Sequence, residues 1–97
     1  MPSAPAPADV VAPVTVRFWA AARAATGLER EAIAVPLEGI DLGDLMSELT
    51  ARHTELVRVL AVASLLVDGH PHGRAATAQG KALPGALVEI LPPFAGG

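Results

Sequence analysis

One segment, residues 41–53, has the periodicity of an amphipathic helix, and it limits the folds open to this chain more than any other feature. Asp41 stands at the N-cap position, and Asp44 adds a second carboxylate to the first turn, where the helix dipole favours negative charge. The apolar side chains recur at i, i+3, i+4 and i+7 and are Leu42, Leu45, Met46 and Leu49. A single apolar stripe must be buried against another layer, so we expect a sheet beside this helix.

The segment VTVRFW, residues 14–19, predicts the first strand of that sheet. Its side chains alternate, so that Val14, Val16 and Phe18 share one face. The other face ends in Trp19. Clean alternation of this kind is typical of a strand buried on one face only.

Weaker signals lie between this strand and the end of the long helix pattern. Residues 20–27 are rich in alanine and end on glycine, which predicts a short helix or turn with a glycine stop. Residues 31–36 predict a second short strand closed by proline, and the mixed charges of residues 26–31 (TGLERE) indicate a solvated turn. Residues 55–61 are compatible with a further turn or two of helix.

The second half of the chain predicts a hairpin and a last strand. SLLV, residues 64–67, runs into Asp-Gly at 68–69, a pair that tolerates the positive φ angles of a tight turn. Residues 70–85 carry Gly and Pro throughout and indicate a loop around one short strand. Residues 86–91 (ALVEIL) alternate again and put Leu91 on the outer face.

This order of elements indicates an α+β fold, with one main helix packed across one face of a small mixed sheet. The 97 residues suffice for one domain, which we place at residues 14–91. Residues 1–13 are built mainly from Ala and Pro and are expected to form a disordered leader. Residues 92–97 form an extended tail.

Composition argues against several functional classes. Ten acidic and seven basic residues give a net charge of −3, which disfavours binding to nucleic acid. The absence of cysteine excludes disulfides, zinc–thiolate sites and thiol catalysis. The apolar runs are too short to cross a membrane, and the N-terminal residues do not resemble a signal peptide, so a cytoplasmic location is expected.

No catalytic or metal site is predicted within the domain. His70 and His72 could share a metal ion, but no third ligand is near them in the sequence, and we interpret them as polar residues of a hairpin. No phosphate-binding glycine loop and no Ser/His/Asp set is present. The chain is therefore expected to have no catalytic machinery of its own.

The last residues, ILPPFAGG, form the most unusual stretch of the sequence. Pro92 and Pro93 cannot donate ladder hydrogen bonds, so they end the strand and stiffen the base of the tail. Gly96 and Gly97 have the smallest cross-section of any residues, as a tail threading a narrow channel requires. The alternative is a frayed end without function.

Taken together, these segments resemble the ubiquitin-like sulfur carriers, the family that includes the small subunit of molybdopterin synthase and the thiamine-thiazole sulfur carrier. The resemblance extends over residues 14–97. It rests on the opening VRFWAAARAATG, the Leu-rich helix, the LLVDG hairpin and the closing VEILPPFAGG. It implies a β-grasp fold, a more specific statement than the order of elements supports alone.

The resemblance also implies a chemical role for the end of the chain. Gly97 would be adenylylated and then converted to a thiocarboxylate, which donates sulfur in molybdopterin synthesis. The implied partners are an E1-like adenylating enzyme that uses ATP, a sulfur donor protein and the large subunit of molybdopterin synthase. No cofactor is expected on this chain itself.

Other residues are expected to guide the tail or contact these partners. Trp19 and Leu91 share the outer face and suggest a partner-binding patch, unless a loop or helix covers them. Phe94 would either anchor in a partner groove or fold back onto Leu91. Ala95 and Gly96 would lie with the two prolines in the channel that receives the tail.

Three other functions remain compatible with the sequence. The chain could carry sulfur for another pathway, such as thiamine-thiazole synthesis. It could be a ubiquitin-like modifier, joined to lysine side chains through the carboxylate of Gly97. It could also be an interaction domain in which the Gly-Gly ending has no role.

Overall fold

A computed structural model describes residues 11–93 of the chain. Residues 1–10 of the predicted leader and residues 94–97 of the predicted tail lie outside this described part. The elements, in chain order, are β1 Val14–Phe18, α1 Ala20–Thr26, β2 Arg30–Ile33, β3 Ile40–Asp41, α2 Leu42–Arg52, α3 Leu56–Leu60, β4 Ser64–Val67, β5 His70–Arg74, the 3-10 turn η2 Ala75–Thr77, β6 Lys81–Ala82 and β7 Leu87–Leu91.

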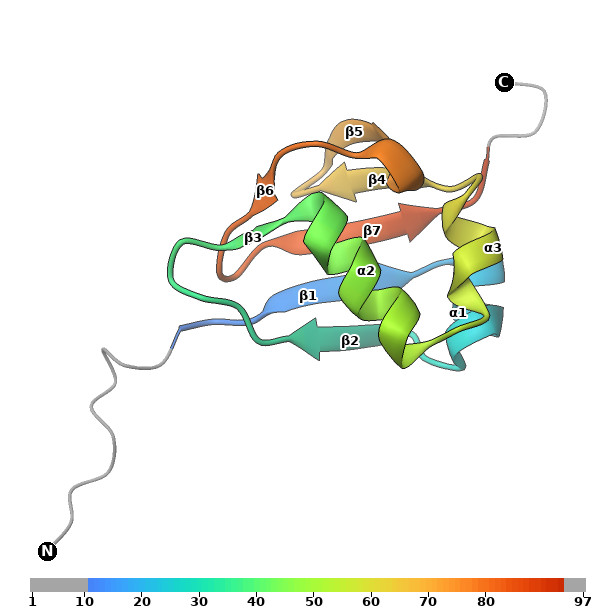
Figure 1. The fold of residues 1–97 in the computed structure, drawn as a ribbon, viewed down its shortest axis with the longest axis horizontal. Coiled ribbons are helices and arrows are strands. Elements are labelled where there is room, and N and C mark those ends of the chain that lie inside the picture. The colour runs from blue at the N-terminus through green and yellow to red at the C-terminus, as the bar shows by residue number, and fades with distance from the viewer. Residues whose placement is uncertain (1–10, 94–97) are drawn as a thin grey trace, which may run out of the picture.

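The main sheet has five strands in the order β2-β1-β7-β4-β5 (Figure 1). β1 runs parallel to β7, with Val16 opposite Val88, and the other neighbouring strands are antiparallel. The last strand of the chain is therefore the central strand, with a hydrogen-bonded neighbour on each side. β3 and β6 form a separate two-stranded pair.

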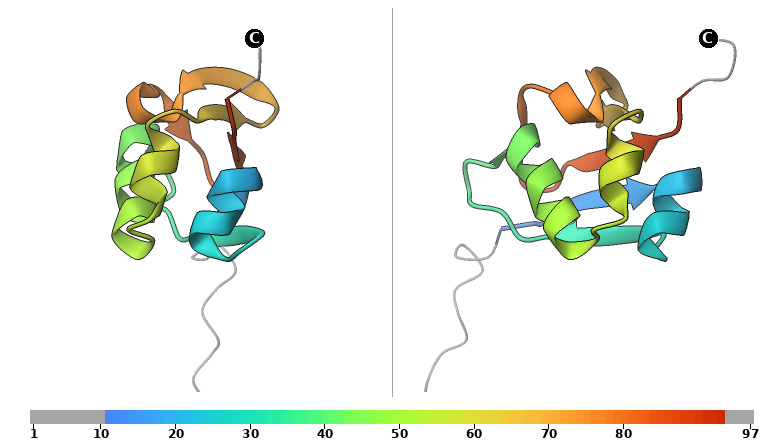
Figure 2. Two further views of the ribbon diagram at one scale, coloured as in Figure 1. Left: turned by 90° about the vertical axis from the view of Figure 1, so that its right-hand side faces the viewer. Right: turned by 45° about the vertical axis from the view of Figure 1, so that its right-hand side comes forward.

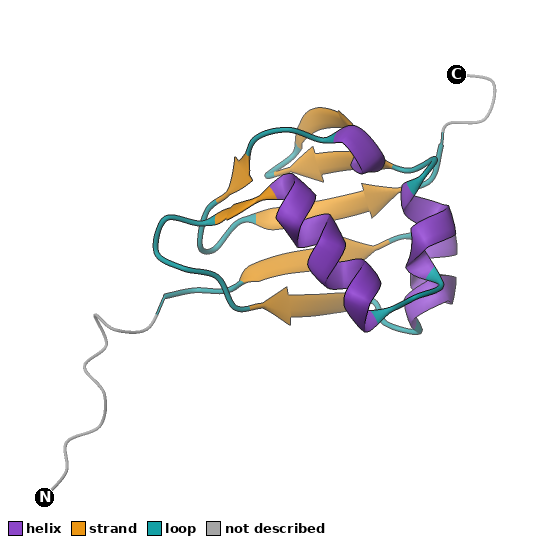
Figure 3. Cartoon of the chain, viewed as in Figure 1, coloured by secondary structure: helices purple, strands orange, loops and turns teal. Residues whose placement is uncertain are grey.

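The helices α2 and α3 cover one face of the sheet, and α1 lies at its end (Figures 2 and 3). Among the described residues, no helix covers the opposite face. We call this second face the open face. Its side chains, assigned from the strand registers, include Arg17, Leu66, Leu87, Glu89 and Leu91. This architecture confirms the predicted α+β layering.

The core lies between α2 and the inner face of the sheet. Val14, Val16 and Phe18 are buried while the residues between them are partly exposed, and β7 alternates in the same way. These side chains meet the stripe of α2, in which Leu45 and Leu49 are fully buried. Each large apolar side chain buried in this way stabilises the fold by about 1.5–3 kcal/mol. The predicted inward-facing positions of β1, α2 and β7 are confirmed.

Helix α2 begins differently from the prediction. Asp41 occupies the N-cap position, but its side chain makes no capping hydrogen bond. It lies in β3, opposite Lys81 of β6, and this pairing brings the carbonyl of Gly80 within 2.9 Å of the first helical N–H, that of Leu42. Backbone pairing thus satisfies a donor that side-chain capping was expected to satisfy.

Helix α1 ends at a glycine, as predicted. Gly27 has φ 74°, and its N–H donates to the carbonyl of Arg23 at 2.8 Å. This left-handed residue closes the helix and turns the chain into β2. β2 is shorter than the predicted strand 31–36, because it ends at Ile33 and leaves the buried Val35 outside the ladder.

Residues 70–85 are more regular than the predicted loop around one short strand. Asp68 and Gly69 have φ 50° and 82°, the left-handed angles of a tight hairpin turn. β5 then continues through Pro71 as the edge strand of the sheet, where a proline needs no ladder partner on its outer side. β6 follows after η2 and pairs with β3.

Candidate functional site

The central strand β7 leads directly into the predicted tail. Its last residue, Leu91, lies opposite Ser64 of β4, and Pro92 and Pro93 follow without secondary structure. Pro92 is half-buried and Pro93 is exposed. The remaining predicted tail residues lie outside the described part of the chain, and they are Phe94, Ala95, Gly96 and Gly97. What the structure describes is therefore the base of the tail.

Trp19 is held against β7 close to this base. Its backbone N–H donates to the carbonyl of Ile90 at 3.2 Å, and its indole Nε1 donates to Oε2 of Glu89 at 3.0 Å. The side chain is still 37% exposed. Ala20, the next residue, has φ 47°, an uncommon angle for alanine, and the chain turns there from β1 into α1.

The structure brings the two predicted contact residues to the same end of the open face. Phe18 is opposite Ile90 in the parallel pair β1–β7. Trp19 follows Phe18 and Leu91 follows Ile90, so both residues lie at the end of this strand pair. Trp19 is exposed and Leu91 is half-buried.

Arg17 adds a charged group that sequence reasoning did not single out. Its guanidinium carbon lies 4.3 Å from the centroid of the Trp19 ring, within the range of a cation–π contact. In the sheet, Arg17 stands opposite Glu89 on one side and Arg30 on the other. The indole thus lies between a cation and a carboxylate.

A second polar cluster lies at the other side of the sheet, beneath α2. Glu31 forms an ion pair with Arg52 at 2.9 Å and a hydrogen bond with Nε2 of His53 at 2.8 Å. The side chains of Glu31 and His53 are each only 17% exposed. The predicted solvated turn at residues 26–31 is therefore wrong for Glu31, which faces the helix layer from β2.

The environment of Glu31 lowers its pKa below the ordinary value of a glutamate. Burial raises this pKa, but the hydrogen bonds and charges of His53 and Arg52 lower it by more. Phe18 packs edge-on against His53, with ring centroids 6.0 Å apart. This cluster connects β2 to the end of α2, and we interpret it as a contact that stabilises the fold.

The histidines considered as metal ligands lie in β5. His70 is exposed, and Nδ1 of His72 lies 3.3 Å from the carbonyl oxygen of Gln79. Within residues 11–93, no group of three or more His, Asp or Glu side chains is placed to hold a metal ion.

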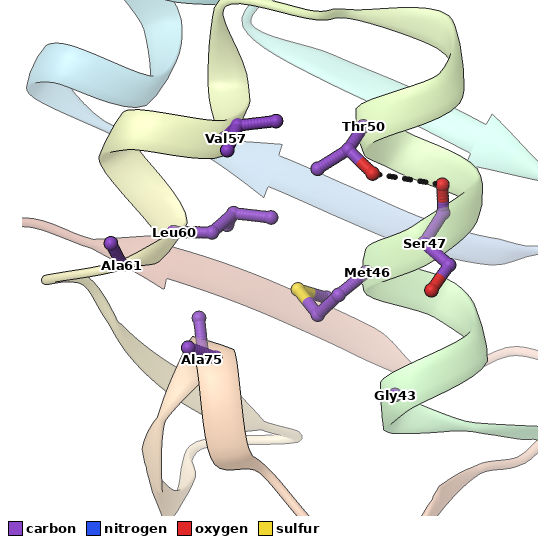
Figure 4. Close-up of a pocket in the computed structure, with 9 residues that line it drawn as sticks. Gly43, Met46, Ser47, Thr50, Val57, Leu60, Ala61 and Ala75 are labelled. Atoms are coloured by element: carbon purple, nitrogen blue, oxygen red, sulfur yellow. Dashed lines mark hydrogen bonds between the residues drawn. The ribbon is translucent and has the colours of Figure 1, made fainter.

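An open apolar groove lies on the helix side of the molecule, between α2, α3 and η2 (Figure 4). It encloses about 390 Å³. Met46, Leu60 and Ala75 contribute to its lining, and Thr50 at its side donates its hydroxyl to the carbonyl of Ser47. None of the predicted site residues contributes to it.

Helices long and apolar enough to span a bilayer are absent from the part of the chain that the structure describes. No protein-family model matches the sequence, and no curated protein matches it. Solved structures do match over most of the chain.

One of them, assigned as subunit 1 of molybdopterin converting factor from Pyrococcus furiosus, has a TM-score of 0.64 at 23% identity, covering 86% of this chain and 99% of the other. Small archaeal modifier protein 1 from Methanosarcina acetivorans has a TM-score of 0.63 at 23% identity, covering 91% and 99%.

A third match comes from the complex of subunits 1 and 2 of the Helicobacter pylori molybdopterin-converting factor. Its TM-score is 0.55 at 24% identity, covering 87% of this chain and 97% of the other. The TM-scores of these three structures show a common fold, and at identities of 23–24% the likeness shows the fold alone. The chain therefore has the β-grasp, or ubiquitin-like, fold of these converting-factor and modifier proteins.

Proposed function

We propose that this protein is a sulfur carrier, the small subunit of a molybdopterin synthase, and that its sulfur is held as a thiocarboxylate on Gly97. The observation that carries the proposal is the position of β7. This central strand is hydrogen-bonded on both sides and runs without interruption into Pro92 and Pro93, so the residues after it start from a rigid base.

The length and composition of the tail suit delivery of a carboxylate to another protein's active site. The residues after Leu91 reach about 20 Å when extended, which is comparable to the depth of a buried site. The paired prolines disfavour a return of the chain to the sheet, and Gly96 and Gly97 add no side chain that would obstruct a channel.

The chemistry requires activation, because a carboxylate is inert toward nucleophiles at neutral pH. In the proposed sequence the Gly97 carboxylate attacks the α-phosphorus of ATP in the active site of an adenylating enzyme, and pyrophosphate leaves. The outer sulfur of a persulfide on the donor protein then attacks the acyl carbon, and AMP leaves. A thiol reductant cleaves the remaining sulfur–sulfur bond to the donor and is itself oxidised to a disulfide, which releases the donor thiol. The resulting thiocarboxylate supplies sulfur to the large synthase subunit.

Trp19 and Leu91 are proposed to contact the adenylating enzyme and the large subunit. Tryptophan is frequent among residues that dominate binding energy at protein interfaces. Here the indole lies at the end of the open face from which the tail leaves. Phe94 is proposed to enter a groove of the partner. The solved Helicobacter pylori complex supports a partnership of this kind for a protein of the same fold.

A second candidate function is that of a protein modifier, in which the activated Gly97 carboxylate is joined to a lysine side chain. The likeness to small archaeal modifier protein 1 favours it, since the TM-score of 0.63 is nearly that of the converting-factor subunit, 0.64. Both functions begin with the same adenylylation. Sulfur carriage for thiazole synthesis shares the same first steps.

Intact-mass spectrometry separates these functions. The protein is incubated with ATP, the adenylating enzyme of the same organism and a sulfur donor. A sulfur carrier gains the mass difference between sulfur and oxygen at Gly97, whereas a modifier appears joined to another protein. An unchanged mass in the presence of an active enzyme would contradict both. Addition of the large subunit and the molybdopterin precursor then tests the pathway, since only a synthase subunit returns to its original mass.

A further inference from the structure

The open face carries an excess of positive charge, although the whole chain has a net charge of −3. Arg17 of β1 lies opposite Arg30 of β2 in the strand register. Arg74 of β5 lies opposite Ser64 of β4, and Ser64 lies opposite Leu91 of β7 on its other side. The strand registers place one carboxylate among these three arginines, that of Glu89. Three of the chain's seven basic residues therefore lie on this face.

That single carboxylate is already engaged. Glu89 accepts the hydrogen bond from the Trp19 indole at 3.0 Å. Arg17 is placed over the same ring at 4.3 Å. Arg30 and Arg74 are exposed, and neither has a salt bridge within the described residues. Their charges are therefore available to a partner.

The arrangement of the strands places Arg30 and Arg74 at opposite edges of the face. Arg30 lies on β2 and Arg74 on β5, which are the two edge strands of the sheet. Leu66 and Leu91 lie between them on β4 and β7, and both are half-buried. Arg17 and Glu89 also lie between the edge strands, and their opposite charges stand opposite one another. A partner that fits this face needs apolar side chains against Leu66 and Leu91 and negative charge on both sides.

We infer that the open face binds a partner protein whose contact surface has an apolar centre flanked by Asp and Glu side chains, and that Arg30 and Arg74 accelerate this association. The inference rests on the proposed function, which supplies the partners, the adenylating enzyme and the large synthase subunit. Complementary charge at the rim of an interface mainly raises the association rate and suppresses wrong partners.

The experiment measures the association rate of the full-length protein with each partner at two salt concentrations. Arg30→Glu and Arg74→Glu are expected to slow association about fivefold or more at about 0.1 M salt. The difference in association rate between these variants and the wild-type protein is expected to shrink at about 1 M salt, because the Debye length falls from roughly 10 Å to roughly 3 Å. Arg30→Gln should give an intermediate rate, because it removes the charge without reversing it.

Arg58→Glu is the matched control, since Arg58 is an exposed residue of α3, on the helix-covered side of the sheet. This variant should associate at nearly the wild-type rate. Circular dichroism and the fluorescence of Trp19, the one tryptophan of the chain, verify that each variant is folded.

The possible outcomes are distinct. If the wild-type protein binds but Arg30→Glu and Arg74→Glu behave like Arg58→Glu, the role of the arginines is wrong and the proposed function stands. If the wild-type protein binds neither partner, the proposed function fails and the inference fails with it. If wild-type protein binds double-stranded DNA as tightly as it binds the enzyme, and Arg30→Glu abolishes this, the face serves a polyanion and the inference is overturned.

Discussion

The indole Nε1 of Trp19 donates a hydrogen bond at 3.0 Å to the carboxylate of Glu89, a residue 70 positions later in the chain. This contact links the end of the first strand to the last strand, two residues before that strand ends at Leu91. Because the guanidinium carbon of Arg17 also lies over the indole, 4.3 Å from the ring centroid, two contacts restrain the orientation of Trp19 before any partner binds. A preorganised aromatic side chain loses less entropy on binding than a mobile one.

Removing the acceptor should release the indole. Glu89→Ala is expected to increase the quenching of Trp19 fluorescence by acrylamide, because the ring loses its hydrogen bond. The free energy of unfolding should fall by about 1 kcal/mol or less, since the contact is solvent-exposed. Glu55→Ala, on an exposed residue preceding α3, is the control. Equal quenching in both variants and wild type would contradict the assigned contact.

The burial of Leu45 in α2 and the exposure of Leu37 outside it predict that their alanine variants differ greatly in stability. Leu45 is fully buried, so Leu45→Ala should lower the free energy of unfolding by about 2–5 kcal/mol through lost burial and the cavity left behind. Leu37, 76% exposed, is the control, and Leu37→Ala should change stability by about 0.5 kcal/mol or less. Urea denaturation measures both, and similar midpoints would contradict the assigned packing.

Much of this fold could be predicted because its signals are local. Alternation identified β1 and β7, the 3.6-residue period identified α2, and Asp68-Gly69 identified the hairpin turn. Residues 70–85 were predicted to hold one short strand without fixed bounds, whereas the structure has two, β5 and β6. β5 contains Pro71, a residue depleted from strands, and its place at the sheet edge is a property of the tertiary structure.

The candidate site was predictable in part for the same reason. Strand alternation placed Trp19 and Leu91 on one face, and the contacts of the Trp19 indole with Glu89 and Arg17, which lie on that face, agree with this. The partners of these side chains were not predictable, since Glu89 is 70 residues from Trp19 in sequence. Likewise, Glu31 and His53 are 22 residues apart, and no spacing rule joins them. Contacts of this kind depend on how the elements pack.

The role of Gly97 leads to a prediction about the tail alone. Gly97→Ala and removal of Gly97 are each expected to abolish the mass gain in the ATP-dependent assay, because alanine adds a methyl group that obstructs the channel and the deletion leaves the terminal carboxylate one residue short of the ATP. Both variants should unfold at the wild-type temperature, since the core ends with β7. Removal of residues 2–10 is the control and should leave the mass gain intact, as β1 begins at Val14. A loss of folding without Gly97 would show a structural role instead.

The lowered pKa of Glu31 gives the fold a defined dependence on acid. Burial opposes ionisation of Glu31, but the contacts with His53 and Arg52 outweigh it, so the folded-state pKa lies below the ordinary glutamate value of 4.5. The stabilisation is therefore present above pH 4.5 and is lost as the pH falls through the folded-state pKa. Glu31→Gln should cost about 1–3 kcal/mol at pH 7 and progressively less below pH 4.5. Urea denaturation between neutral and acid pH measures this, with the exposed Glu38→Gln as the control, and a pH-independent difference would contradict the assigned ion pair.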